Sequence, residues 1–257
     1  MEYEESGWYR FPSPFKEAGL KKLRESVDEI SRQERPEVVL EKNGNAVRAL
    51  HGCHLFDDTC ARLVRLPTLV GLAEELIGEP VYVYQFKVNL KQPQEGAAWP
   101  WHQDFAFWSK EDGMAAPHAV NIAIFLDDTH EDNGPLQVIP GSHRLGLIEP
   151  SVDEQGKRSG DWRNHVAADL EYTVPRPQVD ALLQRTAKRP AIGPAGTVYA
   201  FHPSIVHSSS DNRSMDRRAL LLITYNAVSN APAFSPRPEF LVSRDASPVI
   251  PLADDVL

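Results

Sequence analysis

Three residues of this chain could together bind a redox-active metal ion: His102, Asp104 and His207. Two imidazoles and one carboxylate can hold Fe(II) on one face and leave coordination positions open for chemistry. Arg218 follows His207 by eleven residues and could bind the carboxylate of a chelating cosubstrate. If these four side chains converge, the sequence predicts an oxygenase.

The spacing of His102 and Asp104 would let both side chains enter one cavity. In an extended segment, residues i and i+2 point to the same face. Aromatic residues flank the pair at positions 99, 101, 105, 107 and 108, so a buried His–Asp hydrogen bond in an aromatic core is an open alternative. A second pair with the same spacing, His130 and Asp132, lies in a polar turn and is expected to be solvated.

The position of His207 favours the metal interpretation. It lies beyond the expected strand Thr197–Phe201, and the hydrophilic stretch Ser208–Asp216 can turn the chain back. Arg218 would then begin the adjacent antiparallel strand. A metal ligand and an arginine on paired strands suit a bidentate 2-oxoglutarate, whose keto acid chelates iron while its distal carboxylate meets the guanidinium.

Two alternatives compete with this assignment. His202 is the rival third ligand, although Pro203 follows it directly and nothing downstream lies at a matching spacing. Zn²⁺ also accepts two histidines and one carboxylate and could activate a water for hydrolysis. Zinc chemistry would leave Arg218 without a role.

Hydrophobic periodicity predicts the elements that must position these residues. Helices are expected after Ser13-Pro14, and from Pro67 to Gly78. Alternation and β-branched residues predict strands at Val81–Leu90, Val120–Leu126, Leu136–Ile139, Thr197–Phe201 and Ala219–Tyr225. A long loop over Ser151–Arg176, a short helix near Gln178–Ala187 and a proline-rich, surface-wrapping tail over Ala231–Leu257 complete the chain.

These elements predict a mainly β fold with flanking helices, namely a double-stranded β-helix (a cupin-like jelly roll). We expect a single domain over residues 1–257. Its N-terminal helices would span about 13–78, its jelly-roll core about 79–228, and its tail the remainder. A jelly roll encloses a cavity in which inward side chains from neighbouring strands can meet.

Composition limits the partners that we expect. The 257 residues are 42% hydrophobic and 25% charged, with a net charge of −9 that disfavours nucleic-acid binding. No apolar run of about 18 residues predicts a membrane span, and the N-terminus is acidic and aromatic, unlike a secretory signal. Cys53 and Cys60 are the only cysteines, which favours a reducing cytoplasm over a disulfide framework.

The sequence resembles the phytanoyl-CoA dioxygenase family of Fe(II)/2-oxoglutarate oxygenases. Within this family it is most similar to bacterial ectoine hydroxylases and free-leucine hydroxylases. The motifs that carry the resemblance are Gln85-Phe86-Lys87-Val88-Asn89, Trp101-His102-Gln103-Asp104, Glu111-Asp112-Gly113-Met114, Asn133-Gly134-Pro135-Leu136 and Ile139-Pro140-Gly141-Ser142-His143. His207 and Arg218 complete the match, which covers roughly residues 40–250.

The resemblance implies roles for eleven residues. His102, Asp104 and His207 would ligate iron, and Arg218 would bind the far carboxylate of 2-oxoglutarate. The implied contacts to the cosubstrate are Asn89, Asn121, Ser209 and Trp99. The implied contacts to the substrate are Gln85, Trp108 and Arg48. Gln85 could instead satisfy strand backbone, Trp108 could belong to the core, and Arg48 could form a structural ion pair.

The resemblance also implies an activity. Halogenases of the family lack the aspartate ligand, so the presence of Asp104 favours hydroxylation. The expected reaction uses Fe(II), 2-oxoglutarate and O₂ to hydroxylate an unactivated C–H bond of a small molecule, releasing succinate and CO₂. A free aliphatic amino acid is the favoured substrate, acted on by a monomer or homodimer. The alternatives are an ectoine-like or other biosynthetic intermediate, or a non-catalytic cupin-like module that binds metal or ligand.

Overall fold

Two antiparallel sheets dominate the computed structural model, which describes residues 2–42, 44, 46–150, 162, 166 and 170–257. In spatial order the larger sheet consists of β1 (Trp8–Phe11), β9 (Val198–Phe201), β6 (Ala119–Phe125), β11 (Arg218–Ala227), β4 (Val81–Lys91), β3 (Val47–His51) and β2 (Val38–Leu40). The smaller sheet consists of β5 (Trp99–His102), β10 (His207–Ser209), β7 (Leu136–Val138) and β8 (Arg189–Pro190). This arrangement confirms the predicted jelly-roll class.

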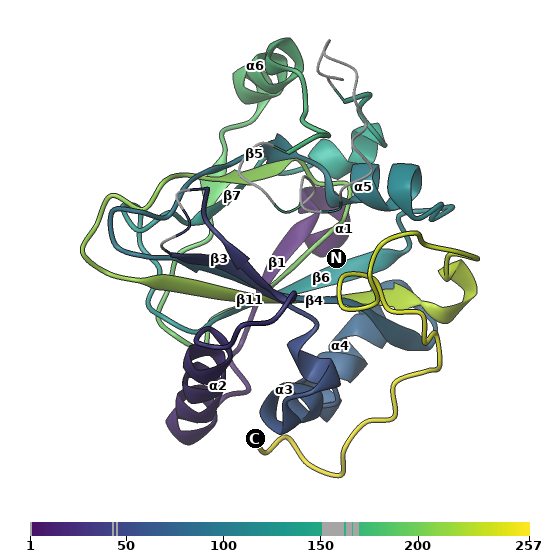
Figure 1. Cartoon of the computed structure of the whole chain (residues 1–257). Helices are drawn as coiled ribbons and strands as arrows, with labels where there is room; N and C mark the ends of the chain where they lie inside the picture. The colour runs from purple at the N-terminus through teal and green to yellow at the C-terminus, as the bar shows by residue number, and fades with distance from the viewer. Residues whose placement is uncertain (1, 43, 45, 151–161, 163–165, 167–169) are drawn as a thin grey trace.

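Helices cover the outer face of the larger sheet. The described helices are α1 (Glu2–Ser6), α2 (Glu17–Ile30), α3 (Asp58–Leu63), α4 (Pro67–Ile77), α5 (Asp104–Glu111) and α6 (Arg176–Arg185). Figure 1 shows α2, α3 and α4 together on one side of the sheet, with α5 and α6 at the opposite end of the molecule. Leu23 of α2 and Val70 of α4 belong to the main apolar core that this packing buries.

Alternation along β11 separates the two faces of the larger sheet. Ala219, Leu221 and Ile223 belong to the main core beneath the helices. Arg218 and Leu220 instead line a cavity on the opposite face, toward the smaller sheet. The period-two pattern that predicted this strand therefore also determines which of its residues can reach a ligand.

A β-bulge in β4 changes which residues face the cavity. Thr224 pairs with Gln85 and Tyr225 with Val83, so Tyr84 is the extra residue. Because of this insertion, Tyr84 and Gln85 both lie on the cavity side: Tyr84 packs against Trp108 of α5, while Gln85 lines the cavity. Bulges commonly re-aim side chains next to functional sites.

The best predicted helix is α4. It begins at Pro67 and ends at Ile77, and Gly78 adopts the left-handed conformation expected of a C-cap, with φ of 86°. The boundary of α2 was predicted too early, because this helix begins at Glu17 rather than beside Ser13-Pro14. The predicted helix near Gln178–Ala187 is α6, which begins two residues earlier.

The structure also bears on the expectations for the C-terminal tail, the short strands, the long loop and membrane spans. The predicted tail crosses the surface (yellow in Figure 1): the Val249 N–H donates to Val81 O and the Leu252 N–H to Arg65 O, each at 2.8 Å. The short strand β1, which pairs with β9, was not predicted. Most of the predicted loop Ser151–Arg176 lies outside the described residues. Within the part of the chain that is described, no helix is long and apolar enough to cross a bilayer.

Gly52 offers a test of how the tail is held against the sheet. Its φ is +61°, and a Cβ at this position would lie 2.8 Å from both Cβ and O of Phe240. We expect Gly52→Ala to lower the free energy of unfolding by roughly 1–3 kcal/mol, because both backbone strain and a backbone clash result. Urea titration followed by circular dichroism measures this change.

The matched control is Gly71→Ala in α4. A Cβ there meets nothing within 4 Å, and alanine is favoured over glycine in a helix interior by about 1 kcal/mol. The control should be neutral or stabilising, and equal losses in both variants would contradict the assigned strain at Gly52.

Candidate metal centre

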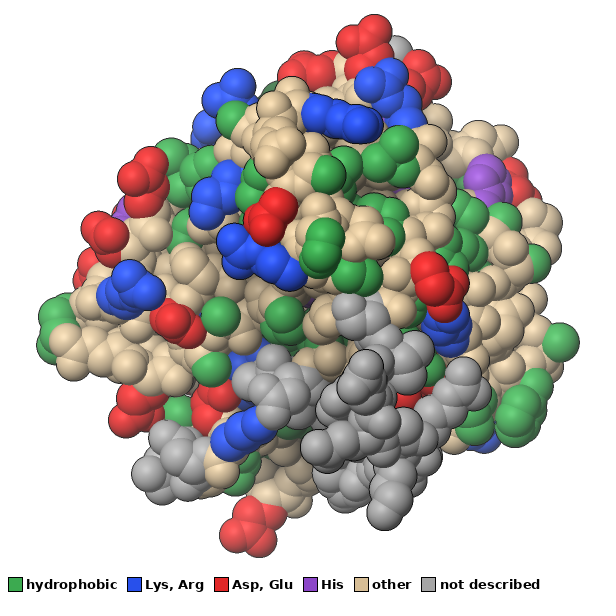
Figure 2. All heavy atoms as spheres, turned by 90° about the horizontal axis from the view of Figure 1, so that it is seen from above, with side chains coloured by type: hydrophobic (Ala, Val, Ile, Leu, Met, Phe, Trp, Pro, Cys, Tyr) green, Lys and Arg blue, Asp and Glu red, His purple; other side chains and the backbone are tan. Residues whose placement is uncertain are grey.

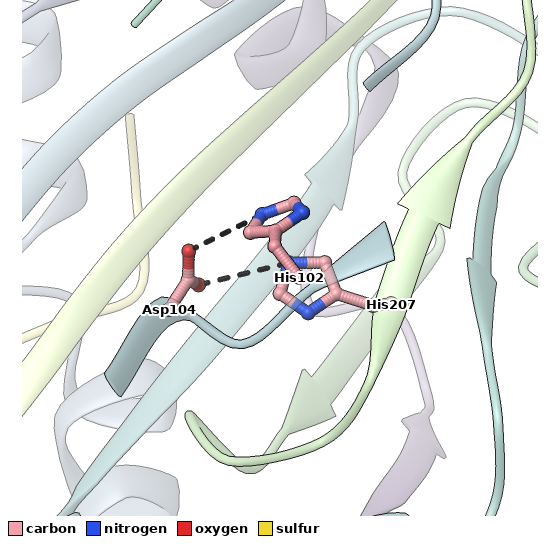
Figure 3. Close-up of side chains that lie close together, drawn as sticks. All are labelled: His102, Asp104 and His207. Carbon is pink, nitrogen blue, oxygen red and sulfur yellow. Dashed lines mark ion pairs between the residues drawn. The ribbon is translucent and has the colours of Figure 1, made fainter. Parts of the chain in front are cut away.

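His102, Asp104 and His207 converge in the lining of one cavity, as the sequence predicted. Their ligand atoms lie within 4.8 Å of one another. Asp104 Oδ1 is 3.7 Å from His102 Nε2, and Asp104 Oδ2 is 3.9 Å from His207 Nε2 (Figure 3). The two histidines are direct cross-strand partners on β5 and β10, so strand pairing alone brings the imidazoles together.

The expected same-face arrangement of His102 and Asp104 holds because Gln103 between them is extended, with φ of −120° and ψ of 127°. The expected strand does not continue, however: β5 ends at His102, and Asp104 is the first residue of α5. The carboxylate therefore projects from the first turn of a helix, where negative charge is favoured by the helix dipole. Figure 3 shows all three side chains directed toward a common point despite this change of backbone.

The protonation states suit a divalent metal. His102 Nδ1 donates to Pro100 O at 2.7 Å and His207 Nδ1 to Ile205 O at 3.0 Å, which leaves both Nε2 atoms to bind metal. Burial lowers the pKa of His207, and burial together with His207 lowers the pKa of His102 to about 3. Both imidazoles are therefore neutral at pH 7, as metal binding requires.

Several neighbours keep the Asp104 carboxylate ionised and oriented. Burial alone would raise its pKa, but Lys87 and the two histidines outweigh that effect and lower the pKa to about 2. Asn121 Nδ2 donates to Asp104 Oδ2 at 2.8 Å, and Thr224 Oγ1 donates to Asn121 Oδ1 at 2.6 Å. These bonds fix the carboxylate as a negative ligand of defined orientation.

Arg218 lies in the same cavity, but not on a strand paired with that of His207. β10 pairs with β5 and β7 in the smaller sheet, whereas Arg218 begins β11 in the larger one. The prediction of paired strands was therefore wrong. The residues meet because the two sheets face each other, and both line the cavity between them.

The guanidinium of Arg218 has unused hydrogen-bonding capacity. Its Nε donates to Gly134 O at 3.0 Å, and its Nη2 donates to the same oxygen. Its Nη1 is buried without a partner among the described residues, as is Ser209 Oγ nearby in the cavity lining. Burial lowers the pKa of Arg218 to about 9, so it remains a cation at pH 7. A ligand carboxylate would satisfy this unpaired donor and offset the cost of a buried charge.

Comparison with known proteins identifies the family. The family model described as phytanoyl-CoA dioxygenase (PhyH) matches residues 3–220. The chain belongs to the phytanoyl-CoA dioxygenase family. It is 60% identical over 257 residues to an L-proline trans-4-hydroxylase of Streptomyces griseoviridis, covering 100% of this chain and 96% of that protein. It is 32% identical to an ectoine dioxygenase of Bordetella bronchiseptica, covering 95% of this chain and 81% of that protein.

Solved structures of the family agree with this assignment. The crystal structure of EctD from S. alaskensis with 2-oxoglutarate and 5-hydroxyectoine has a TM-score of 0.81 and 27% sequence identity, covering 100% of this chain and 85% of that one. The structure of EctD with bound Fe has a TM-score of 0.83 and 25% identity, covering 99% and 86% of the two chains.

The remaining residues implied by the family resemblance divide into two groups. The cavity lining includes Asn89, Ser209, Trp99, Gln85 and Trp108. Asn121 and Arg48 do not line it. Asn121 contacts Asp104 instead, and Arg48 Nη1 lies 3.1 Å from both carboxylate oxygens of Glu41 with its guanidinium stacked 3.8 Å over Trp99. This environment matches the structural ion pair considered for Arg48.

The rival histidines lie elsewhere. His202 Nδ1 accepts from the Ser204 N–H at 3.0 Å, and its ring lies 5.1 Å from that of His143. His130 is partly exposed and pairs with Asp216 at 3.3 Å, as expected for a solvated turn.

Three ionisable residues of the cavity lining were not predicted from the sequence: Lys87, His51 and Arg237. Lys87 could have been found, because it lies midway between Gln85 and Asn89 on an alternating strand and must share their face. No comparable signal marks His51 or Arg237, since their positions depend on how β3 and the tail pack against β4.

The contact between Asn121 and Asp104 predicts a measurable effect on metal binding. We expect Asn121→Ala to weaken Fe(II) affinity by roughly 10- to 100-fold, the range typical for loss of a hydrogen bond to a metal ligand. Anaerobic titration of the apoprotein with Fe(II), or with Mn(II) as a surrogate, measures this affinity. Thr224→Val removes only the more distant hydroxyl and should have a smaller effect; an unchanged affinity in Asn121→Ala would refute its bracing role.

Proposed function

We propose that this protein is an Fe(II)- and 2-oxoglutarate-dependent dioxygenase that hydroxylates a free amino acid, with L-proline as its substrate. The observation that carries the proposal is a single cavity with two complementary parts. One part holds two neutral imidazoles and one ionised carboxylate. The other presents a buried arginine with an unsatisfied donor.

In this proposal His102, Asp104 and His207 hold Fe(II). The metal, with 2-oxoglutarate and O₂ as cosubstrates, would supply the oxidising chemistry that turns a C–H bond into C–OH and releases succinate and CO₂. Arg218 binds the distal carboxylate of 2-oxoglutarate through Nη1, and Ser209 contributes its free hydroxyl. Asn89 and Trp99 line the same cavity.

The protein's own contribution is to orient the substrate and to exclude water. Phe107 and Trp108 are almost fully buried and line the cavity together with Trp99. Such an aromatic lining suits an aliphatic ring or chain, while a few polar groups such as Gln85 determine its orientation. Asn121 acts through Asp104 rather than by touching the cosubstrate.

Two arguments support the choice of reaction and substrate. Asp104 is present and positioned as a ligand, which favours hydroxylation over halogenation. The likeness to L-proline trans-4-hydroxylase extends over the whole chain at 60% identity, compared with 32% for an ectoine dioxygenase. An ectoine-like intermediate is therefore the second candidate. The two cysteines are buried thiols, which supports a cytoplasmic location for an enzyme that acts as a monomer or homodimer.

A substrate panel tests the proposal directly. The enzyme is incubated with Fe(II), 2-oxoglutarate, O₂ and individual candidates that include L-proline, L-leucine and ectoine. We expect L-proline to gain one oxygen by mass spectrometry, with one succinate formed for each product. Turnover of ectoine alone would favour the second candidate. Iron binding without any turnover would indicate a binding module, and activity without O₂ and 2-oxoglutarate would indicate zinc-type hydrolysis.

The role of Arg218 is tested by Arg218→Ala. Loss of a charge-assisted hydrogen bond should raise the KM for 2-oxoglutarate by at least about tenfold, measured by succinate release. Arg217→Ala is the matched control, because the neighbouring Arg217 pairs with Asp127 and Asp28 outside the cavity. An equal KM in the two variants would exclude Arg218 as the cosubstrate anchor.

A further inference from the structure

A second group of polar residues lines the cavity beside the metal centre. His51 at the end of β3 and Lys87 of β4 are cross-strand partners, and both line the cavity. Lys87 Nζ lies 3.5 Å from Asp104 Oδ1. Arg237, from the C-terminal tail, lines the same cavity.

His51 has a buried hydrogen-bonding atom that nothing in the described chain satisfies. Its side chain is 5% exposed, and its Nε2 has no hydrogen-bond partner among the described residues. Burial, with smaller effects from Lys87 and Arg237, lowers the pKa of His51 to about 3. The ring is therefore neutral at pH 7, and a buried polar atom without a partner typically indicates a missing ligand or water.

The charge of Lys87 is left without a dedicated partner once the metal site is filled. Arg237 is neutralised by Asp112, because Arg237 Nε donates to Asp112 Oδ1 at 2.8 Å and Nη2 donates to Oδ2. Among the described residues, the one carboxylate that pairs with Lys87 is that of Asp104, at the limit of hydrogen-bonding distance. When Asp104 ligates Fe(II), its negative charge is compensated by the metal ion. The ammonium group of Lys87 would then attract another anion.

That anion is distinct from the distal carboxylate of 2-oxoglutarate. Arg218 pairs in register with Lys91, and Lys87 lies four residues further along β4. At about 3.3 Å per residue, the backbone positions are about 13 Å apart along the sheet. The cavity thus has two cationic regions, one at Arg218 and one beside the metal centre.

We propose that Lys87 and His51 form the subsite that binds the carboxylate of the substrate, Lys87 through its ammonium group and His51 through Nε2. This inference rests on the proposed function, since it assigns the carboxylate of a free amino acid to these residues. Because Lys87 lies beside Asp104, a carboxylate held there belongs to a short substrate whose remaining carbons stay close to the metal centre. The subsite would explain selection of a free amino acid over its amide or peptide.

Binding measurements on the loaded enzyme test this subsite. The protein is loaded with Fe(II) and 2-oxoglutarate without O₂, and L-proline and L-prolinamide are titrated by calorimetry. The wild type should bind L-proline at least about tenfold more tightly than the amide, because only the acid provides a charge-assisted hydrogen bond. Lys87→Met should lose this preference, Lys87→Arg should retain much of it, and His51→Leu should reduce it.

Control variants distinguish a role of Lys87 in binding the substrate carboxylate from a role in binding 2-oxoglutarate or Fe(II). Lys110→Met removes a lysine of α5 that pairs with Glu149 at the surface and should keep the wild-type preference. Lys87→Gln and thermal unfolding of each variant guard against a folding defect. The proposal is overturned if Lys87→Met still binds L-proline more tightly than L-prolinamide, or if it weakens only the binding of 2-oxoglutarate. It is also overturned if Lys87→Met weakens Fe(II) binding and weakens the binding of L-proline and L-prolinamide equally.

The two proposals fail in different ways. If the wild type hydroxylates L-proline but does not prefer it over L-prolinamide, the carboxylate subsite is wrong and the proposed function stands. If the wild type neither binds nor oxidises any amino acid of the panel, the proposed function is itself wrong, and the subsite falls with it.

Discussion

The structure depends on holding one ionised carboxylate, that of Asp104, inside the protein. A buried carboxylate is strongly disfavoured unless charges and hydrogen bonds compensate for lost hydration. Here Lys87 of β4 provides the compensating positive charge and Asn121 of β6 donates a hydrogen bond, while the neutral His102 of β5 and His207 of β10 keep their Nε2 atoms available to a metal ion. The two sheets must therefore keep a fixed spacing for the carboxylate to stay ionised, and this same spacing forms the metal centre.

Buried cations elsewhere in the molecule show what a purely structural charge looks like. Arg48 is bonded to Glu41 and stacks on Trp99. Arg237 is bonded to Asp112, which also accepts from Tyr84 and Ser235. Arg218 differs, because its guanidinium contacts a backbone carbonyl through Nε, while its Nη1 has no partner within the described part of the chain. Incomplete hydrogen bonding, rather than burial, thus distinguishes Arg218, the proposed cosubstrate anchor, from the two structural cations.

Sequence reasoning predicted the elements whose local signals are strong and failed where long-range packing decides. α4 has proline at its start and glycine after its end, and its bounds were predicted closely. β1 has only four residues and exists because it pairs with β9, which nothing local indicates. The ligand triad was predicted from residue type and spacing, but the change from β5 to α5 between His102 and Asp104 was not, because it leaves no periodic pattern. His51 joins the cavity only through the pairing of β3 with β4.

The bulge in β4 is the one local irregularity on which the cavity's chemistry depends. In a strictly alternating strand, Tyr82 and Tyr84 would share one face while Gln85, Lys87 and Asn89 occupied the other. The inserted residue lets all five lie on the cavity side, the tyrosines packing near α5 and the polar residues lining the ligand space. The bulge is visible in the sequence as a change in the alternation of core residues. Aliphatic or aromatic core residues occupy the odd positions 81 and 83 and then the even positions 86, 88 and 90. A one-residue change of phase in a hydrophobic pattern therefore predicts where a strand changes from packing to binding.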